Sequence, residues 1–357
     1  MSPVRAPMDS VTAHSVQVGE SVLTLRDVTP GDVGAVLALH IHVFGPGADT
    51  SWFAWKYGQG PDQGQGLAIG AWHDGQLVAY CGGLPRTLRL RNHNLRGLQI
   101  GDVMVHPAWR GILSRRGPFF QVSKRFYDSQ IGAASSHPFE LGFGFPNERH
   151  LRLAVLLGLL RDGGVIECLH WSSLQTAGSR LPWGWLWRPL PTSSPRFDRA
   201  VNAAWKSMQA ELPDVILGQR NAAYLRWRFV DRPSAVDPYL KETSRYHFFE
   251  LRRPWSHVAS GIAVMDLKST TPHWLDWVGP LALMPLASRT CRMEAAGAGA
   301  ASLMAWASSA VASQLADSDI QRREVCAGLG IPASSNLGSQ DVSGTRWWLM
   351  GGDTDFL

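Results

Sequence analysis

Two aromatic segments in different halves of the chain match each other position by position. Residues 52–57 read Trp-Phe-Ala-Trp-Lys-Tyr and residues 224–229 read Tyr-Leu-Arg-Trp-Arg-Phe, and Pro61 and Pro233 follow at corresponding positions. After each segment, the pattern predicts a hairpin-like pair of strands. Such a repeat is typical of an internal duplication. We therefore expect two copies of one α/β unit, each with a short helix whose aromatic side chains pack under a sheet.

Length and composition agree with two folded units. The chain has 357 residues, of which 45% are hydrophobic and 18% charged, values typical of globular proteins with room for two cores. Its net charge is +5, and the basic residues are scattered rather than clustered. This distribution favours an anionic small ligand, such as a nucleotide cofactor, over a nucleic-acid partner.

The cysteines and the apolar stretches indicate the cellular compartment of the protein. The four cysteines, Cys81, Cys168, Cys291 and Cys326, form no CxxC pair, so we expect no metal and no disulfide framework. The first twenty residues are a polar leader without a signal-peptide core. Residues 295–313 carry no charge but consist mostly of Ala, Gly and Ser, which predicts a soluble helix over 294–316 and no membrane partner. We expect a cytoplasmic protein.

The order of predicted elements in the first half is strand, helix, hairpin, strand, helix, strand, helix, strand. The strands fall at 22–26, 67–72, 77–81, 103–105, 140–145 and 165–171, and the helices begin at Pro30, Pro118 and Asn147. Between 176 and 195 the composition shifts to Trp, Pro, Ser and Gly, which indicates a junction. We therefore expect a first domain at 21–175, a linker at 176–196 and a second domain at 197–357.

Two segments of the first half carry a resemblance to a known superfamily. Residues 101–111 read Gly-Asp-Val-Met-Val-His-Pro-Ala-Trp-Arg-Gly, and residues 142–149 read Gly-Phe-Gly-Phe-Pro-Asn-Glu-Arg. Together, in this order, they resemble the two central motifs of the GNAT N-acetyltransferases over roughly residues 22–171. The resemblance implies an α/β fold of two GNAT-like domains, each with a mixed, mostly antiparallel twisted sheet flanked by helices, the second copy being degenerate.

The resemblance implies acetyl-CoA as co-substrate and assigns its binding residues. In this family the strand at Val103, Met104 and Val105 parts from its neighbour, so that its backbone can pair with the pantetheine arm. The start of the following helix offers free N–H groups to the diphosphate, and arginines add charge-assisted hydrogen bonds. The corresponding residues here are Arg110, Gly111, Arg115, Arg116 and Gly117, with Asn147 at the second motif. The spacing of this loop departs from the usual family pattern.

An amine must lose a proton before it attacks a thioester, so the site needs a base. Asp102 and Glu140 are the candidates, because the splayed strands converge on the acceptor there. The other alternative for each is a carboxylate bonded to backbone at a strand end. His106 is a weaker candidate, and His150 is interpreted as a solvated helix residue. The Tyr that serves many GNAT enzymes as general acid is replaced by Ala154.

The second half shows no comparable phosphate loop. Residues 286–293 contain no Arg-Gly pair, and residues 347–356 predict a terminal strand followed by solvated acids. We interpret this half as a degenerate copy that shapes the acceptor site.

The sequence therefore predicts an N-acetyltransferase that acts on a primary amine of a small molecule or peptide, with an amino sugar or a peptide amine mildly preferred by analogy. Two alternatives stay open. One is a non-catalytic acyl-CoA-binding or scaffold module with the GNAT fold, which Ala154 and the loop spacing favour. The other is a Fem-like aminoacyl transferase, although the long basic helical arm expected of it is missing. The oligomeric state is not indicated.

Overall fold

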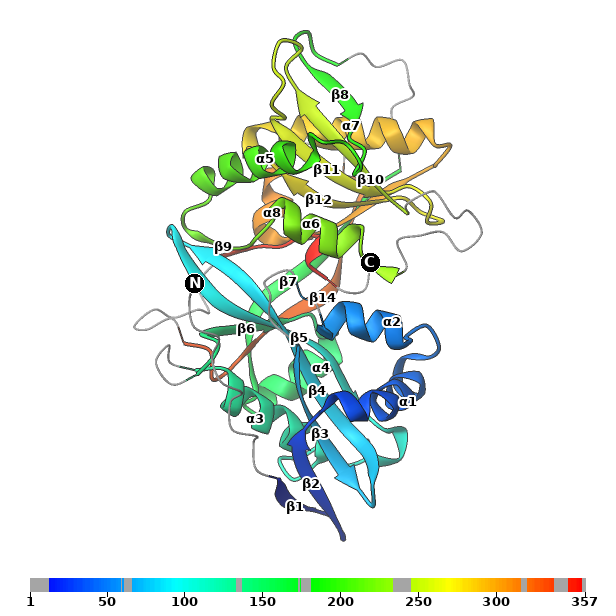
Figure 1. Cartoon of the computed structure of the whole chain (residues 1–357), viewed down its shortest axis with the longest axis vertical. Helices are drawn as coiled ribbons and strands as arrows, with labels where there is room; N and C mark the ends of the chain where they lie inside the picture. The colour runs from blue at the N-terminus through cyan, green and yellow to red at the C-terminus, as the bar shows by residue number, and fades with distance from the viewer. Residues whose placement is uncertain are drawn as a thin grey trace.

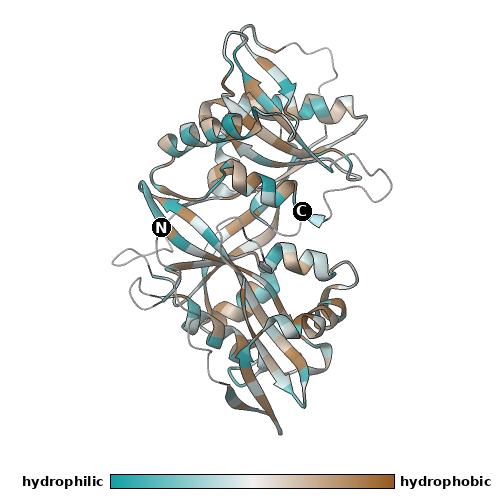
Figure 2. Ribbon diagram, viewed as in Figure 1, coloured by the Kyte–Doolittle hydropathy of each residue, from teal (hydrophilic) through white to brown (hydrophobic). Residues whose placement is uncertain are grey.

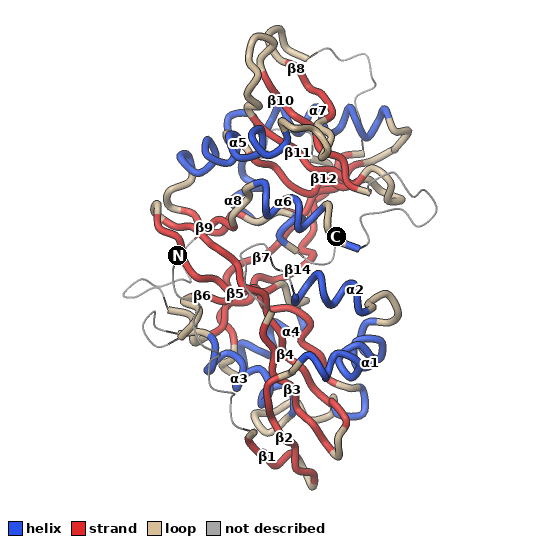
Figure 3. Tube along the Cα trace, viewed as in Figure 1, coloured by secondary structure: helices blue, strands red, loops and turns tan. Residues whose placement is uncertain are grey.

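The computed structural model describes residues 13–58, 60, 66–132, 137–172, 174, 181–233, 245–315, 320–336 and 346–354. Within them the strands form one 15-stranded sheet in the order β1-β2-β3-β4-β5-β6-β14-β7-β13-β12-β11-β10-β8, with β9 and β15 attached at β4. Most neighbours are antiparallel, and helices flank the sheet (Figures 1 and 3). The predicted fold class, a mixed and mostly antiparallel α/β fold, is confirmed.

The first half contributes the strands at the lower end of the molecule in Figure 1. Its elements are β1 (His14–Val18), β2 (Ser21–Asp27), α1 (Val33–Phe44), α2 (Thr50–Phe53), β3 (Leu67–His73), β4 (Gln76–Leu90), β5 (His93–Val105), α3 (Pro118–Gln130), β6 (Leu141–Gly144), α4 (Glu148–Leu156) and β7 (Leu160–Trp171). One turn of π-helix, η2 (Ala54–Gly58), follows α2, and short 3₁₀ helices precede α1 (η1, Pro30–Asp32) and follow β5 (η3, Pro107–Trp109).

The second half repeats this kind of order. Its elements are β8 (Leu186–Pro189), α5 (Phe197–Glu211), β9 (Val215–Gly218), α6 (Ala222–Phe229), β10 (Tyr246–Arg252), β11 (Gly261–Asp266), β12 (His273–Val278), η5 (Leu281–Leu283), α7 (Met284–Gly297), β13 (Leu303–Ser308), α8 (Ser309–Gln314), β14 (Arg322–Pro332), β15 (Arg346–Trp348) and η7 (Gly351–Asp353). The predicted helix over 294–316 is wrong, because α7 ends at Gly297 and β13 occupies the middle of that range. Apolar residues at alternate positions of a buried strand need no charges, so the lack of charge did not distinguish strand from helix.

The two halves exchange strands. β14, from the end of the chain, lies between β6 and β7 of the first half, and β7 in turn pairs with β13 of the second half. The predicted linker contributes β8, which pairs with β10 at the far edge of the sheet. The sheet is therefore continuous through the middle of the molecule (Figure 1).

The repeated aromatic segments meet at this middle. Trp55 and Trp227, which hold equivalent positions in the repeat, stack with ring centroids 4.9 Å apart and an interplanar angle of 16°. The Trp55 indole donates to the Trp227 carbonyl at 2.7 Å, and the Trp227 indole donates to the Trp55 carbonyl at 3.2 Å. Reciprocal contacts between equivalent residues are what a two-fold relation between the copies produces, which supports the expected duplication.

Side chains of the sheet alternate between two cores. Along β4, Tyr80 belongs to the core that contains α1 and the second-half residues, whereas Cys81 belongs to the core under α3 and α4. Successive strand residues point to opposite faces, so α1 covers one face of the first-half sheet and α3 with α4 cover the other. Figure 2 shows α1 as a largely apolar helix. None of the described helices has the length and hydropathy needed to cross a membrane.

Candidate active site

The strands β5 and β6 pair over only part of their length. They run parallel from the pair Gly97–Leu141 to the pair Ile100–Gly144. Beyond this point β5 continues to Val105, paired on its other side with β4 as far as Ala79–Val105. The sheet therefore opens between Gly101–Val105 and the segment after Gly144. The β6 edge of β5 is left without a ladder partner there, so it has backbone groups to offer to a ligand.

A β-bulge marks the point where the opening begins. Between the pairs Tyr80–Met104 and Gly82–Gly101, β5 has two residues where β4 has one. Asp102 is one of these two and has φ +52°, in the left-handed region that Asp tolerates better than most residues. An extra residue bends a strand and changes the direction of its side chains. The bulge thus lets Asp102 leave the regular alternation of β5.

Asp102 is held by two residues of the aromatic repeat. Its Oδ2 accepts a hydrogen bond from the Tyr57 hydroxyl at 2.5 Å and lies 2.8 Å from Nζ of Lys56. The Lys56 side chain is 1% exposed and the Asp102 side chain 11%, so the ion pair is screened little by water. Burial, together with the charge of Asp102, raises the pKa of Tyr57 and of Tyr80 well above the ordinary value. Tyr57 is therefore a hydrogen-bond donor to the carboxylate at neutral pH.

A pocket of about 450 Å³ fills the opening of the sheet. Asp102 lies in its wall together with backbone of β5 and the segment after β6, and β14 closes it from the second half. Its lining includes Gly101, Val103, Phe145, Pro146, Trp306 and Cys326. The wall is mostly apolar, with a carboxylate at one place, which is the composition expected of a small-molecule site.

The predicted phosphate loop leads from β5 to the start of α3. Arg110 donates from Nε to the Val105 carbonyl at 3.0 Å and so fixes the end of β5, while Arg115 and Arg116 are exposed. Gly117 is the N-cap of α3 and Pro118 its first residue. A Cβ on Gly117 would lie 1.9 Å from the Ile112 carbonyl oxygen, whereas one on Gly111 would meet nothing within 4 Å. The turn therefore needs glycine at 117 but not at 111.

The second motif places two polar residues at the pocket. Asn147 caps α4 by accepting a hydrogen bond from the backbone N–H of His150 at 2.9 Å, and both residues line the pocket. Burial lowers the pKa of His150, so its imidazole is neutral at neutral pH. The interpretation of His150 as a solvated residue is wrong. Ala154, one turn further along α4, is fully buried and offers no acid.

The remaining predicted residues lie at different distances from the opening. Met104 is buried in the core that contains α1, and Val105 packs against the other core, under α3 and α4. Of the three predicted pantetheine-binding residues, only Val103 lines the pocket. His106 turns its ring nitrogen to the backbone of Ala108.

Glu140 lies at the start of β6, at the end away from the opening. It accepts a hydrogen bond from the Arg96 backbone at 2.9 Å and faces the Arg96 guanidinium at 3.5 Å. The structure thus brings together Asp102, Val103 and Asn147 at the pocket and keeps Glu140 apart from them.

Sequence reasoning missed Lys56, Tyr57 and His150. The signal for Lys56 was present, because a basic residue stands inside an aromatic run in both copies of the repeat. A buried charge requires a partner, and that partner could only be found in three dimensions.

Comparisons with known proteins agree with this geometry. Residues 24–150 match the family model described as acetyltransferase (GNAT) domain. A search of curated proteins found no match. The chain therefore carries a GNAT acetyltransferase domain in its first half, over residues 24–150.

Solved structures share the fold along most of the chain. A probable N-acyltransferase from Enterococcus faecalis superposes with a TM-score of 0.64 at 11% identity, over 88% of this chain and 73% of its own. A GCN5-related N-acetyltransferase from Kribbella flavida gives 0.55 at 14%, over 87% and 70%. The N-myristoyltransferase of Saccharomyces cerevisiae with bound myristoyl-CoA and inhibitors gives 0.53 at 12%, over 97% and 87%. The likeness of fold therefore includes the second half.

Proposed function

We propose that this protein is an N-acyltransferase that moves an acetyl group from acetyl-CoA to a primary amine of a small molecule or peptide. One observation carries the proposal: the sheet opens between β5 and β6 at a pocket whose wall contains the carboxylate of Asp102, a side chain that is 11% exposed. The GNAT match over residues 24–150 supports acyl transfer as the reaction class.

The donor would lie along the open edge of β5. Its pantetheine amides would pair with the backbone of Gly101–Val105, as an added strand pairs with a sheet edge. Its diphosphate would face the N-terminus of α3 and the exposed Arg115 and Arg116, where N–H groups and positive charge favour an anion. The thioester would then point into the pocket beside Asp102.

Asp102 is the base in this proposal. Lys56 at 2.8 Å and Tyr57 at 2.5 Å hold one carboxylate oxygen, Oδ2, which leaves Oδ1 for the acceptor. The amine nitrogen attacks the thioester carbon, its proton passes to Asp102, and the C–S bond of the tetrahedral intermediate breaks. The thiolate takes its proton from water, since Ala154 supplies none and the pocket-lining imidazole of His150, whose pKa is lowered by burial, is already neutral. A positioned base of this kind contributes roughly 10²–10⁴ in rate.

The test is calorimetric titration of the full chain with acetyl-CoA. The variant R115A/R116A removes two exposed charges from the loop, and R89A/R91A is the matched control because it removes two charges from the distant β4–β5 turn. Micromolar binding that weakens about 10-fold or more only in R115A/R116A supports the phosphate assignment. Absence of binding to the unaltered protein contradicts the proposed function.

A second candidate function follows from Ala154. If acetyl-CoA binds but a panel of amino sugars and peptide amines gives no turnover, the protein is a non-catalytic acyl-CoA-binding module. The fully buried methyl of Ala154, where many GNAT enzymes carry a Tyr, is the observation that favours this alternative.

A further inference from the structure

Three potential metal ligands converge on one face of the sheet, where β7, β14 and β13 meet. Cys168 and His170 are two residues apart on β7 and therefore share a face. Glu324 of β14 is the register partner of Cys168. One donor atom from each of these three residues lies within 4.8 Å of the other two.

The contacts converge on a single atom of His170. Its Nε2 lies 3.3 Å from the Cys168 sulfur and 3.2 Å from Oε1 of Glu324. A catalytic relay would use the two different ring nitrogens, whereas here both neighbours approach the same one. A tetrahedral Zn²⁺ with bonds of about 2.0–2.3 Å holds its ligand atoms about 3.3–3.6 Å apart. The Cys168–His170 and His170–Glu324 spacings are thus close to those around a shared cation.

Two residues outside the cluster orient the ligands. The Trp306 side chain hydrogen-bonds the sulfur of Cys168, and Arg322 binds the other oxygen of Glu324, Oε2, at 2.6 Å. Partners of this kind fix ligand geometry in known metal sites. The Met304 thioether lies 3.9 Å from the Cys168 sulfur, which adds a second soft atom. A bound cation would displace the thiol proton of Cys168, and the thiolate and the carboxylate would then carry two negative charges beside Arg322.

The geometry points to a binding site for a divalent, thiophilic cation of the Zn²⁺ type, with Cys168, His170 and Glu324 as its ligands. The donor set of sulfur, imidazole nitrogen and carboxylate oxygen is the one Zn²⁺ prefers. Because β7 comes from the first half and β14 from the second, the cation would fasten the exchanged strands to each other. The prediction of no metal rested on the lack of a CxxC pair; in this cluster the ligands come from two strands far apart in sequence.

The test uses the full-length protein without a histidine tag, stripped with a chelator and titrated with Zn²⁺ against a chromophoric competitor. We expect one Zn²⁺ per chain with a dissociation constant in the micromolar range or tighter, and a loss of at least 10-fold in H170A and in C168S. Co²⁺ in place of Zn²⁺ should give a thiolate-to-metal charge-transfer band that C168S abolishes. C326S is the matched control, since Cys326 is a half-buried cysteine near Cys168 that is outside the ligand set.

E324Q keeps the result interpretable if a core variant fails to fold, because the Glu324 side chain is 42% exposed. It should weaken Zn²⁺ binding while the melting temperature of the stripped protein stays unchanged. The inference is overturned if the unaltered protein binds no Zn²⁺. It is also overturned if the ligand variants H170A and E324Q bind Zn²⁺ as tightly as the control C326S and the unaltered protein do.

Discussion

The sheet opens at equivalent places in the two halves of the molecule, but the two openings differ in what occupies them. In the first half, β5 and β6 part at Ile100–Gly144 and the gap is a pocket of about 450 Å³. In the second half, the parallel strands β12 and β13 pair only at His273–Met304, and η7 from the end of the described chain packs against both. One copy thus has a pocket at its opening, and the other fills the equivalent gap with its own backbone.

The segment that joins the open strand to the next helix also differs between the two copies. β5 is followed by a loop with Arg110, Arg115 and Arg116 before α3 begins at Pro118. β12 is followed by Gly279, Pro280 and the short η5, and α7 begins directly at Met284. The second copy therefore has no room for an anion-binding loop. The described residues of the second copy thus show neither the loop nor the open gap that form the pocket of the first copy.

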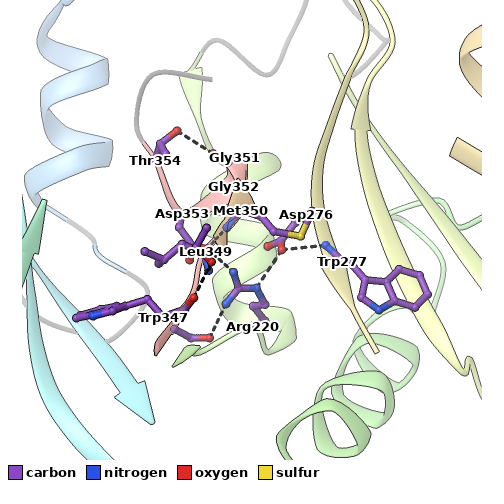
Figure 4. Close-up of polar contacts among 12 residues, drawn as sticks. Arg220, Asp276, Trp277, Trp347, Leu349, Met350, Gly351, Gly352, Asp353 and Thr354 are labelled. Carbon is purple, nitrogen blue, oxygen red and sulfur yellow. Dashed lines mark hydrogen bonds and ion pairs between the residues drawn. The ribbon is translucent and has the colours of Figure 1, made fainter. Parts of the chain in front are cut away.

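Buried charges hold the filling segment in place (Figure 4). Arg220 is fully buried and donates hydrogen bonds to Asp276, at 3.0 Å, and to Asp353. The Asp353 carboxylate also accepts a hydrogen bond from the backbone N–H of Met350 at 2.9 Å. Arg86 of the first half reaches Asp353 at 3.4 Å. Burial raises the pKa of Asp276 to about 6 although Arg220 opposes the shift. The prediction that the terminal acids are solvated is wrong for Asp353, which is 1% exposed.

The largest effect should come from breaking this network. Asp353→Ala removes the partner of Arg220 and leaves its charge buried, so we expect the free energy of unfolding to fall by about 3–5 kcal/mol. Chemical denaturation measures it. Asp198→Ala is the control, because the Arg226–Asp198 ion pair has a similar length, 2.8 Å, but its side chains are 35% and 60% exposed. This variant should lower the free energy of unfolding by about 1 kcal/mol or less. Equal losses would show that burial of the network is not what matters.

Asp102→Asn tests the open copy. The amide cannot accept the proton of the amine, so kcat should fall about 10²–10³-fold, once an acceptor is in hand, with acetyl-CoA binding retained. Glu140→Gln should change kcat less than about 3-fold, since that carboxylate is bonded to Arg96 away from the pocket. The reverse result would assign the base to Glu140. Melting curves of both variants check that Lys56 tolerates the loss of its partner.

Gly117→Ala probes the loop that the second copy lacks. The added methyl would meet the Ile112 carbonyl, so the turn must shift and acetyl-CoA affinity should drop roughly 10-fold, about 1.4 kcal/mol. Gly111→Ala meets no neighbour within 4 Å and should bind as the unaltered protein does. Titration calorimetry compares the two. Unchanged affinity in Gly117→Ala would remove the loop from the binding site.

The smallest effect should be the coupling between the two copies at their contact. A double-mutant cycle of Trp55→Phe and Trp227→Phe isolates the stacked pair and its reciprocal hydrogen bonds. We expect a coupling of about 1 kcal/mol in the free energy of unfolding. Additive single effects would mean that the stacking contributes only burial and that the two copies are held by the exchanged strands.

Local patterns predicted the elements around the site. Pro30 and Pro118 each stand at the first position of a helical segment, and the strand that ends at Val105 was identified from its residues together with the loop after it. Alternation and helix-start signals act between near neighbours, so a sequence displays them directly. The length of β4 and β5, and the strand β13 in place of a helix, depended on partners elsewhere in the chain.

The sequence by itself determined the repeat, the superfamily resemblance, which implies an open strand and a phosphate loop, and Asp102 as a candidate base. Only the tertiary structure decided that Lys56 and Tyr57 hold Asp102, that Glu140 lies apart, that β14 closes the pocket and that Asp353 is buried in the second copy. The physical reason is the range of the interactions. Propensity and periodicity are written in adjacent residues, whereas a buried charge is stable only beside a partner that the fold brings from a distant part of the chain.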